Sequence, residues 1–304
     1  MTNTMDTPIK EPTFPGLSPR RKFADKTATV LVTASVAVAI VPLVWVLWAT
    51  VSKGIGAVTS ADWWWRSQAG MTAFEAGGGA YHAIVGTLLQ GLVCAVISIP
   101  VGVFVGIYLV EYGGGTRLGR LTTFMVDILT GVPSIVAALF IYALWVATFG
   151  FQRSGFAVSL ALVLLMIPVI VRATEEMLRI VPMDLREASY ALGVPKWKTI
   201  SRIVIPTALS GIVTGIMLAL ARVMGETAPL LILVGYAQSR NFDMFSGFQG
   251  SLPGMMYDQV SAGGSGNPIT DARLWGAALT LVILVAVLNI GARFIAKFFA
   301  PKKV

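Results

Sequence analysis

Two arginine–glutamate pairs stand inside long apolar stretches of the 304-residue sequence. Arg222 and Glu226 are spaced i, i+4, and Arg172 and Glu175 are spaced i, i+3, so each pair shares one face if its segment is helical. The planar guanidinium of arginine binds an oxyanion through parallel hydrogen bonds. Charged residues within a membrane are costly and usually face a bundle interior or a water-filled path. The pairs therefore predict either an anion path or structural clamps between helices.

The stretches that hold these pairs are long enough to cross a membrane. Hydrophobic residues make up 56% of the chain and charged residues only 12%, whereas soluble domains carry about 25% charged residues. A spanning helix needs about 20 predominantly apolar residues. The composition therefore predicts an all-α polytopic membrane protein with six transmembrane helices. The uncharged stretches assigned to these spans are 28–52, 84–110, 128–152, 154–171, 203–221 and 274–292.

The basic residues are divided unevenly between the two sides of this arrangement. Six spans place both termini on one side, where 17 of the 23 lysines and arginines fall; five fall on the other side, and Arg222 lies within a span. Because cytoplasmic loops carry the excess of basic residues, both termini and the loop 179–206 are expected in the cytoplasm. The net charge of +8 is thus explained by the basic residues of the cytoplasmic loops and tails, and no nucleic-acid partner is expected. Residues 1–27 are expected to form a disordered cytoplasmic tail, and residues 28–304 the membrane domain.

Motifs for catalysis within the chain are missing. The sequence has no GxxxxGK[ST] loop for nucleotide phosphates, no HExxH and no GxSxG, and it contains one cysteine and one histidine. We therefore expect neither catalytic residues nor a metal site. The aromatic run Trp63, Trp64 and Trp65 is typical of a membrane interface.

The sequence of the loop 179–206 predicts two short helices. Pro182 ends the preceding helix, and Asp184 with Glu187 has the spacing of a capping box. Gly193 is expected to end the short helix with a positive φ, and Pro195 to begin a second one. The first helix is too short to be stable alone, so its apolar face must pack against another surface. Either it lies on the lipid surface or it binds a soluble partner. The expected face consists of Leu185, Ala188, Ser189 and Leu192.

At these residues the chain resembles a known family. The segment from Glu187 to Pro206 is similar to the EAA loop of ABC importer permeases, with Ser189 in place of the second alanine. Further segments resemble the PstA-like permeases of phosphate-specific ABC importers, and the likeness covers residues 80–304. These segments are GVPSIV at 131–136, VIVRATEEMLRIVP at 169–182 and ARVMGETAPLL at 221–231.

The resemblance implies the fold of a type I ABC importer transmembrane domain in the bacterial inner membrane. It implies a PstC-like sister permease, ATP-binding subunits that hold ATP and Mg²⁺, and an external phosphate-binding protein. No cofactor is expected in this chain. The short loop helix would couple to the ATP-binding subunit through Glu187, Ala188, Ser189, Leu192 and Gly193.

The resemblance also implies a substrate, inorganic phosphate, and a path through Arg222, Glu226, Arg172 and Glu175. A glutamate repels phosphate unless it accepts a hydrogen bond from the retained P–OH, which sulfate lacks. Asp127 and Pro133 are candidate gating residues, although a helix cap or plain packing explains them as well. Two alternatives stay open: a permease for another oxyanion such as sulfate or molybdate, and an anion channel or carrier that works without ATP.

Overall fold

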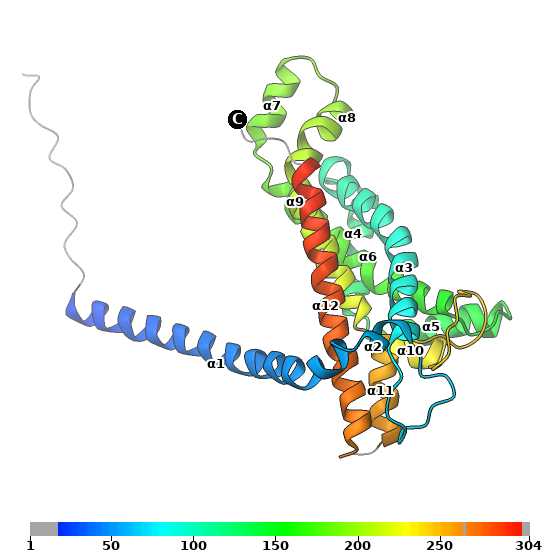
Figure 1. The fold of residues 1–304 in the computed structure, drawn as a ribbon. Coiled ribbons are helices and arrows are strands. Elements are labelled where there is room, and N and C mark those ends of the chain that lie inside the picture. Colours follow the sequence, from blue (N-terminus) through cyan, green and yellow to red (C-terminus); the bar gives the residue numbers. More distant parts are fainter. Residues whose placement is uncertain (1–17, 264–265, 300–304) are drawn as a thin grey trace, which may run out of the picture. The chain divides into compact units, whose positions relative to one another are not determined.

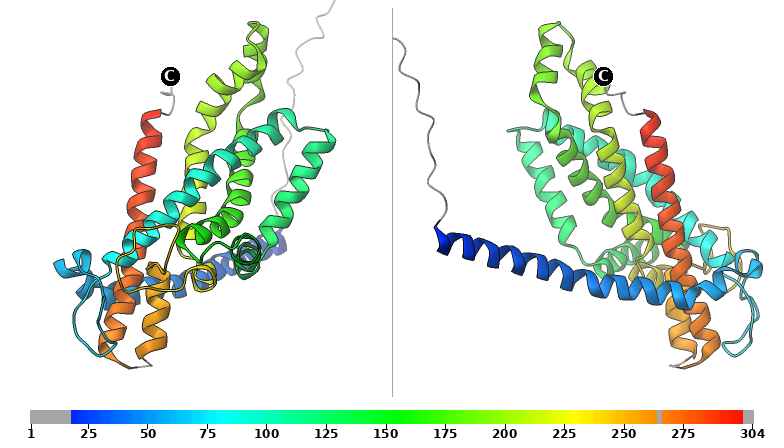
Figure 2. Two further views of the ribbon diagram at one scale, coloured as in Figure 1. Left: turned by 90° about the vertical axis from the view of Figure 1, so that its right-hand side faces the viewer. Right: turned by 60° about the vertical axis from the view of Figure 1, so that its left-hand side comes forward.

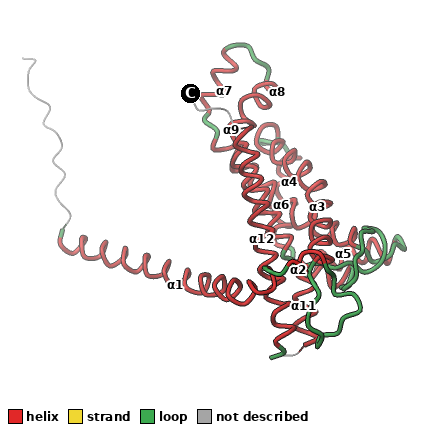
Figure 3. Tube along the Cα trace, viewed as in Figure 1, coloured by secondary structure: helices red, strands yellow, loops and turns green. Residues whose placement is uncertain are grey.

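The computed structural model describes residues 18–263 and 266–299, and every regular element in this part of the chain is helical (Figure 1, Figure 3). The chain divides into two units, residues 1–49 and 50–304, and the boundary falls within the first helix. The α-helices are α1 (Pro19–Val58), α2 (Ala61–Trp65), α3 (Tyr81–Ile107), α4 (Arg117–Gly131), α5 (Ser134–Ile141), α6 (Gly155–Ile180), α7 (Met183–Ala191), α8 (Lys196–Thr199), α9 (Ile205–Met224), α10 (Ala228–Leu233), α11 (Leu252–Gly263) and α12 (Pro268–Phe299). Three segments are π-helical. Segment η1 (Tyr108–Tyr112) continues α3, η2 (Tyr142–Thr148) continues α5, and η3 (Ile200–Val204) directly precedes α9.

Five spans are confirmed as single helices, and the expected third span is bent. Helices α4 and α5 pass the length and hydropathy criteria only as a pair, with an angle of 106° between them. The break lies at Val132 and Pro133, where the backbone of Val132 is extended. A proline restricts the residue before it to such conformations and lacks an N–H group of its own. The third span therefore begins earlier than the stretch 128–152, at Arg117, and bends at Pro133.

The expectation of a disordered tail over residues 1–27 was wrong for residues 19–27. Helix α1 begins at Pro19, so residues 19–27 are helical, and residues 1–17 lie outside the described part of the chain. Proline is well suited to a first helical position because its missing N–H would have no partner there.

Helix α6 is the centre of the second unit and packs against α3 and α9 (Figure 2). Glycines permit the close approach of α3. A Cβ atom added at Gly102 would lie 2.7 Å from Ile170, and one at Gly106 would lie 2.7 Å from Thr174. Small residues of this kind let membrane helices pack at short range.

The ends of the long helices place the loop 179–206 at one end of this bundle. The end of α3, the start of α4 and the C-terminal end of α12 lie toward that end, and α7 and α8 project beyond them (Figure 1, Figure 2). Helices α2 and α11 lie toward the opposite end. This arrangement agrees with the alternation expected from the basic residues.

Candidate functional site

The Arg172 pair is part of a four-residue charge cluster. Nη1 of Arg172 donates to Oε2 of Glu175 at 2.7 Å, as the i, i+3 spacing predicts. Nη2 of Arg172 bonds to Oδ1 of Asp127 on α4, which joins α4 to α6. Arg179 lies 3.5 Å from the other oxygen of Glu175, whose side chain is only 5% exposed. Each carboxylate thus has a cationic partner, and the geometry matches the clamp interpretation of this pair.

The cluster borders an open cavity of about 250 Å³ beside the turn between η1 and α4. Arg120, Thr123, Glu175 and Arg179 contribute polar groups to its wall. The Arg172 cluster is therefore reached from a cavity at the same end of the bundle as α7 and α8.

The structure separates the second pair. Helix α9 ends at Met224 and is capped by Gly225, so Glu226 follows the helix. The prediction that Arg222 and Glu226 share one helical face is therefore wrong. Glycine is a poor helix former, and the next helix, α10, begins at Ala228 with Pro229 in its first turn. In the described part of the chain Arg222 is exposed and has neither an ion pair nor a side-chain hydrogen bond.

Glu226 instead lines a small cavity bounded by α3, α6, α9, α10 and the start of α11. Thr87, Gln90 and Ser251 share its lining, and its volume is about 10 Å³. A single water needs about 10–15 Å³, so this space is far too small for a phosphate ion. Gln90 also donates to Gln249 at 2.9 Å, and Thr87 accepts from the backbone N–H of Leu252 at 2.8 Å. Glu226 thus borders a fixed polar network.

A second polar contact fixes the same region. The hydroxyl of Tyr236 lies 2.8 Å from Nε2 of His82, next to Gly250. Burial, with the negative charge of Asp258, raises the pKa of the Tyr236 phenol. Its hydroxyl therefore stays protonated, and it contacts the imidazole as a hydroxyl and not as a phenolate.

The loop 179–206 contains the two expected helices, α7 and α8. Pro182, not Asp184, occupies the N-cap position of α7, and no side-chain cap forms; Asp184 lies within the first turn. The predicted capping box is therefore absent, because the N-cap of α7 is Pro182, two residues before Asp184. Gly193 has a φ of +73°, as predicted, and Pro195 caps α8.

The expected docking face of α7 is split. Leu185 is 41% exposed, Leu192 is 83% exposed, and Glu187 and Ala188 are also exposed. Ser189 is buried, and its Oγ lies 2.8 Å from Oγ1 of Thr199 on α8. Ser189 therefore joins α7 to α8 and does not belong to the exposed face. The other three residues of that face, and Glu187 beside them, stay available to a partner.

Residues 98–304 match the family model of the binding-protein-dependent transport system inner membrane component. The chain belongs to this family. The phosphate transport system permease protein PstA 1 of Mycobacterium tuberculosis (strain CDC 1551 / Oshkosh) is 54% identical over 301 residues, which cover 98% of this chain and 97% of that protein. PstA of Yersinia pestis is 40% identical over 285 residues, which cover 93% and 92% of the two chains.

Solved structures of ABC importers share the fold of this family member. A chain of a bacterial transporter involved in the import of alginate has a TM-score of 0.59 at 12% identity, and the match covers 91% of this chain and 98% of that one. A chain of the methionine transporter MetNI has a TM-score of 0.56 at 21% identity, with 73% and 95% covered. The prediction of an all-α, type I ABC importer permease fold is confirmed. The chain is a multi-pass inner-membrane component of a transport system.

Sequence reasoning missed one polar contact of this permease loop. Arg186 of α7 lies 2.8 Å from Glu111 in η1, and both side chains are largely buried. Neither residue belongs to a motif, and 75 residues separate them. A glutamate at the very end of an apolar span, opposite a loop rich in basic residues, is the only signal that the sequence offered.

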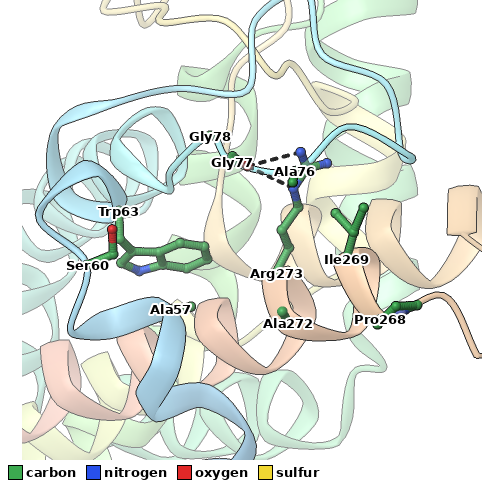
Figure 4. A pocket seen from close by; sticks show the side chains of 10 residues that line it. All are labelled: Ala57, Ser60, Trp63, Ala76, Gly77, Gly78, Pro268, Ile269, Ala272 and Arg273. Carbon is green, nitrogen blue, oxygen red and sulfur yellow. Dashed lines mark hydrogen bonds between the residues drawn. The ribbon is translucent and has the colours of Figure 1, made fainter.

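At the opposite end of the permease, Arg273 organises the loop between α2 and α3. Its guanidinium donates to the backbone carbonyls of Thr72, Glu75 and Gly77 at 2.7–3.3 Å. Figure 4 shows Arg273 and Trp63 on the wall of a cavity of about 320 Å³.

Trp63 is buried and donates to Thr280 at 2.8 Å. Trp63 therefore contributes to packing and is not an exposed anchor, whereas Trp65 is exposed.

Proposed function

We propose that the chain is the permease subunit of an ATP-driven importer and forms part of the membrane path for inorganic phosphate. One observation carries the proposal: 54% identity over 98% of the chain to a phosphate transport system permease. Identity of this extent covers the spans, the loop 179–206 and the segments around Arg172 and Arg222. ABC importers that share only the fold, such as those for alginate and methionine, lie at 12% and 21% identity.

ATP hydrolysis then belongs to separate subunits that bind ATP and Mg²⁺, and this chain contributes no cofactor site. The partners are a PstC-like sister permease, ATP-binding subunits and an external phosphate-binding protein. Helix α7 docks on an ATP-binding subunit through Glu187, Ala188 and Leu192, with Gly193 shaping the turn that follows. Leu185 and Leu192 are both exposed on α7, so two apolar side chains of one short helix are available to a protein surface. Docking also explains why so short a helix is retained.

Arg222 is the first candidate for the phosphate path. Arg222 lies in the last turn of the membrane helix α9, and arginines within membrane segments usually face a bundle interior or a water-filled cavity. Arg222 is exposed on this chain and has no partner among the described residues, so we assign it to a surface shared with the sister permease and with phosphate. Glu226 lies four residues on and provides an acceptor for the P–OH of phosphate once the small cavity that it lines opens.

Arg172 and Glu175 are the second candidates, at the cavity beside the η1–α4 turn. Arg172 must release its ion-pair partners before it binds an anion. Asp127 then competes with the anion for Arg172 and acts as the gating residue. Pro133 supports a gate as well, because it separates α4 from α5. With the basic residues on the side of α7 and α8, both termini lie in the cytoplasm.

The test is uptake of ³²P-phosphate by proteoliposomes that contain this chain, the sister permease and the ATP-binding subunits, with the binding protein outside. We expect uptake with ATP and none with a non-hydrolysable ATP analogue. Equal uptake under both conditions would identify a channel or carrier and contradict the proposal. Unlabelled sulfate or molybdate that stimulates the ATPase in place of phosphate would identify a permease for another oxyanion.

A further inference from the structure

A buried ion pair joins the loop 179–206 to the end of α3. Nη2 of Arg186 lies 2.8 Å from Oε1 of Glu111, and the two side chains are only 11% and 6% exposed. The same guanidinium donates to the carbonyls of Leu178 and Val181 at 3.0 and 3.2 Å. One side chain therefore fastens α7 both to the last turn of α6 and to η1.

The other helix of the loop is fastened to the same place. Lys196, the first residue of α8, bonds through Nζ to the backbone carbonyl of Glu111. Its ammonium group also lies 4.8 Å from the centre of the Tyr112 ring, a distance at which the cation is attracted to the ring face. With the Ser189–Thr199 hydrogen bond, α7, α8 and η1 form a closed ring of contacts.

Two π-helical segments lie where this ring meets the membrane helices. Segment η1 holds Glu111 and continues α3, and η3 links α8 to α9. Short π-helical segments occur frequently at functional sites in helices. Helix α3 in turn packs closely on α6 through Gly102 and Gly106. A displacement of α7 is therefore passed to α3 by side chains, in addition to the covalent links to α6 and α9.

We propose that Glu111 and Arg186 are positioning residues for energy coupling: the pair makes α3 follow α7 when the ATP-binding subunits move. The inference rests on the proposed function. It differs from docking, because Arg186 and Glu111 are buried and face the bundle. It predicts that loss of the pair separates ATP hydrolysis from transport without removing the ATP-binding subunits.

The experiment compares purified, assembled complexes in proteoliposomes, so that any fraction that fails to assemble is excluded. Glu111→Gln removes the charge and keeps the shape of the side chain. We expect its complex to hydrolyse ATP at close to the wild-type rate while phosphate imported per ATP falls about tenfold, within the usual range of coupling between sites. Glu176→Gln is the matched control, since Glu176 is exposed on the same end of α6 and the same chemical change should leave the ratio unchanged.

A double variant tests whether the pair acts as one unit. Glu111→Gln combined with Arg186→Gln should lower the ratio no further than the single change, because the interaction is already lost. A wild-type ratio in assembled Glu111→Gln complexes would overturn the inference, as would additive losses in the double variant. If Glu111→Gln yields no complex, Arg186→Gln alone decides, because it removes the ion pair from the other side: a wild-type ratio there overturns the inference. Failure of the proposed function would appear already in the wild type, as absent ATP-driven phosphate uptake.

Discussion

The hydroxyl groups of Ser189 and Thr199 lie 2.8 Å apart in the interior of the loop 179–206. Both residues are buried, and the contact joins the two short helices α7 and α8. Neither helix is long enough to be stable alone. The orientation of the exposed Leu185 and Leu192 therefore depends on a hydrogen bond that faces away from any partner.

Ser189→Ala should weaken the hold of the permease on its ATP-binding subunit. The change leaves the buried Thr199 hydroxyl without its best partner, at a cost of about 1–3 kcal/mol. We expect less ATP-binding subunit to co-purify with the variant, while the amount of permease in the membrane is unchanged. Ser201→Ala is the control, because Ser201 is exposed and bonds only to the carbonyl of Lys198. Equal co-purification by both variants would show that the bond does not orient α7.

Gly193→Val should have a similar effect through the backbone. At a φ of +73° a side chain with a Cβ is strained by about 1–2 kcal/mol, and valine resists this conformation more than most residues. The end of α7 must then shift, and the ATP-binding subunit should be captured poorly although the spans insert. Gly114→Val controls for bulk, since Gly114 has open space around it and no positive φ. Normal uptake and normal capture with Gly193→Val would refute docking through α7.

Local signals explain which parts of this loop were predictable. The positive φ of Gly193 and the start of α8 after Pro195 follow from the preferences of single residues, and both are confirmed. The direction of Ser189 is not local. Periodicity placed it with Leu185 and Leu192, but a hydroxyl beside a second buried hydroxyl turns toward its partner.

The ion pairs show the same limit over longer distances. The Arg172–Glu175 contact follows from i, i+3 spacing, whereas Asp127 is 45 residues from Arg172 and Glu111 is 75 from Arg186. Such contacts depend on how α3, α4 and α6 pack, which hydropathy does not encode. The Arg222–Glu226 pair failed for a local reason, because Gly225 ended the helix that the spacing rule assumed.

Arg172 should behave mainly as a clamp in stability measurements. Arg172→Gln leaves the buried Glu175 with only Arg179 at 3.5 Å, and breaking a buried pair costs up to about 3–5 kcal/mol. Asp127→Asn should cost at most about 1 kcal/mol, because the Asp127 side chain is 60% exposed. Thermal unfolding of the purified complex in detergent measures both. Arg172→Gln with wild-type stability and no phosphate uptake would instead favour the path.

The topology is testable at three points. Reporter fusions after Gln152 should read as external, and fusions after Gly193 as cytoplasmic. The Glu111–Arg186 contact places the turn after η1 beside α7, so a fusion after Gly114 must agree with the one after Gly193. An external signal at Gly193 would reverse the orientation inferred from the basic residues. Disagreement between Gly114 and Gly193 would contradict the fold.

Arg222→Gln should abolish phosphate uptake while the complex still assembles and retains its basal ATPase activity. Glutamine keeps hydrogen-bonding groups but removes the charge that attracts an oxyanion. A clamp within this chain is already disfavoured, because Glu226 lies beyond the end of α9 and forms no ion pair with Arg222 in the described residues. A clamp to the sister permease would instead show as loss of the sister subunit on purification.

Two further variants make the Arg222 prediction decisive. Arg222→Lys keeps the charge as a single point without the planar fork, so we expect weak uptake with a raised KM. The double variant Arg222→Gln, Glu226→Gln removes both charges and would relieve an unpaired carboxylate if the two residues served only each other. Uptake is measured with ³²P-phosphate in proteoliposomes at equal amounts of assembled complex. Recovery of phosphate uptake in the double variant would contradict the path assignment, because the variant still lacks the Arg222 charge that would attract the anion.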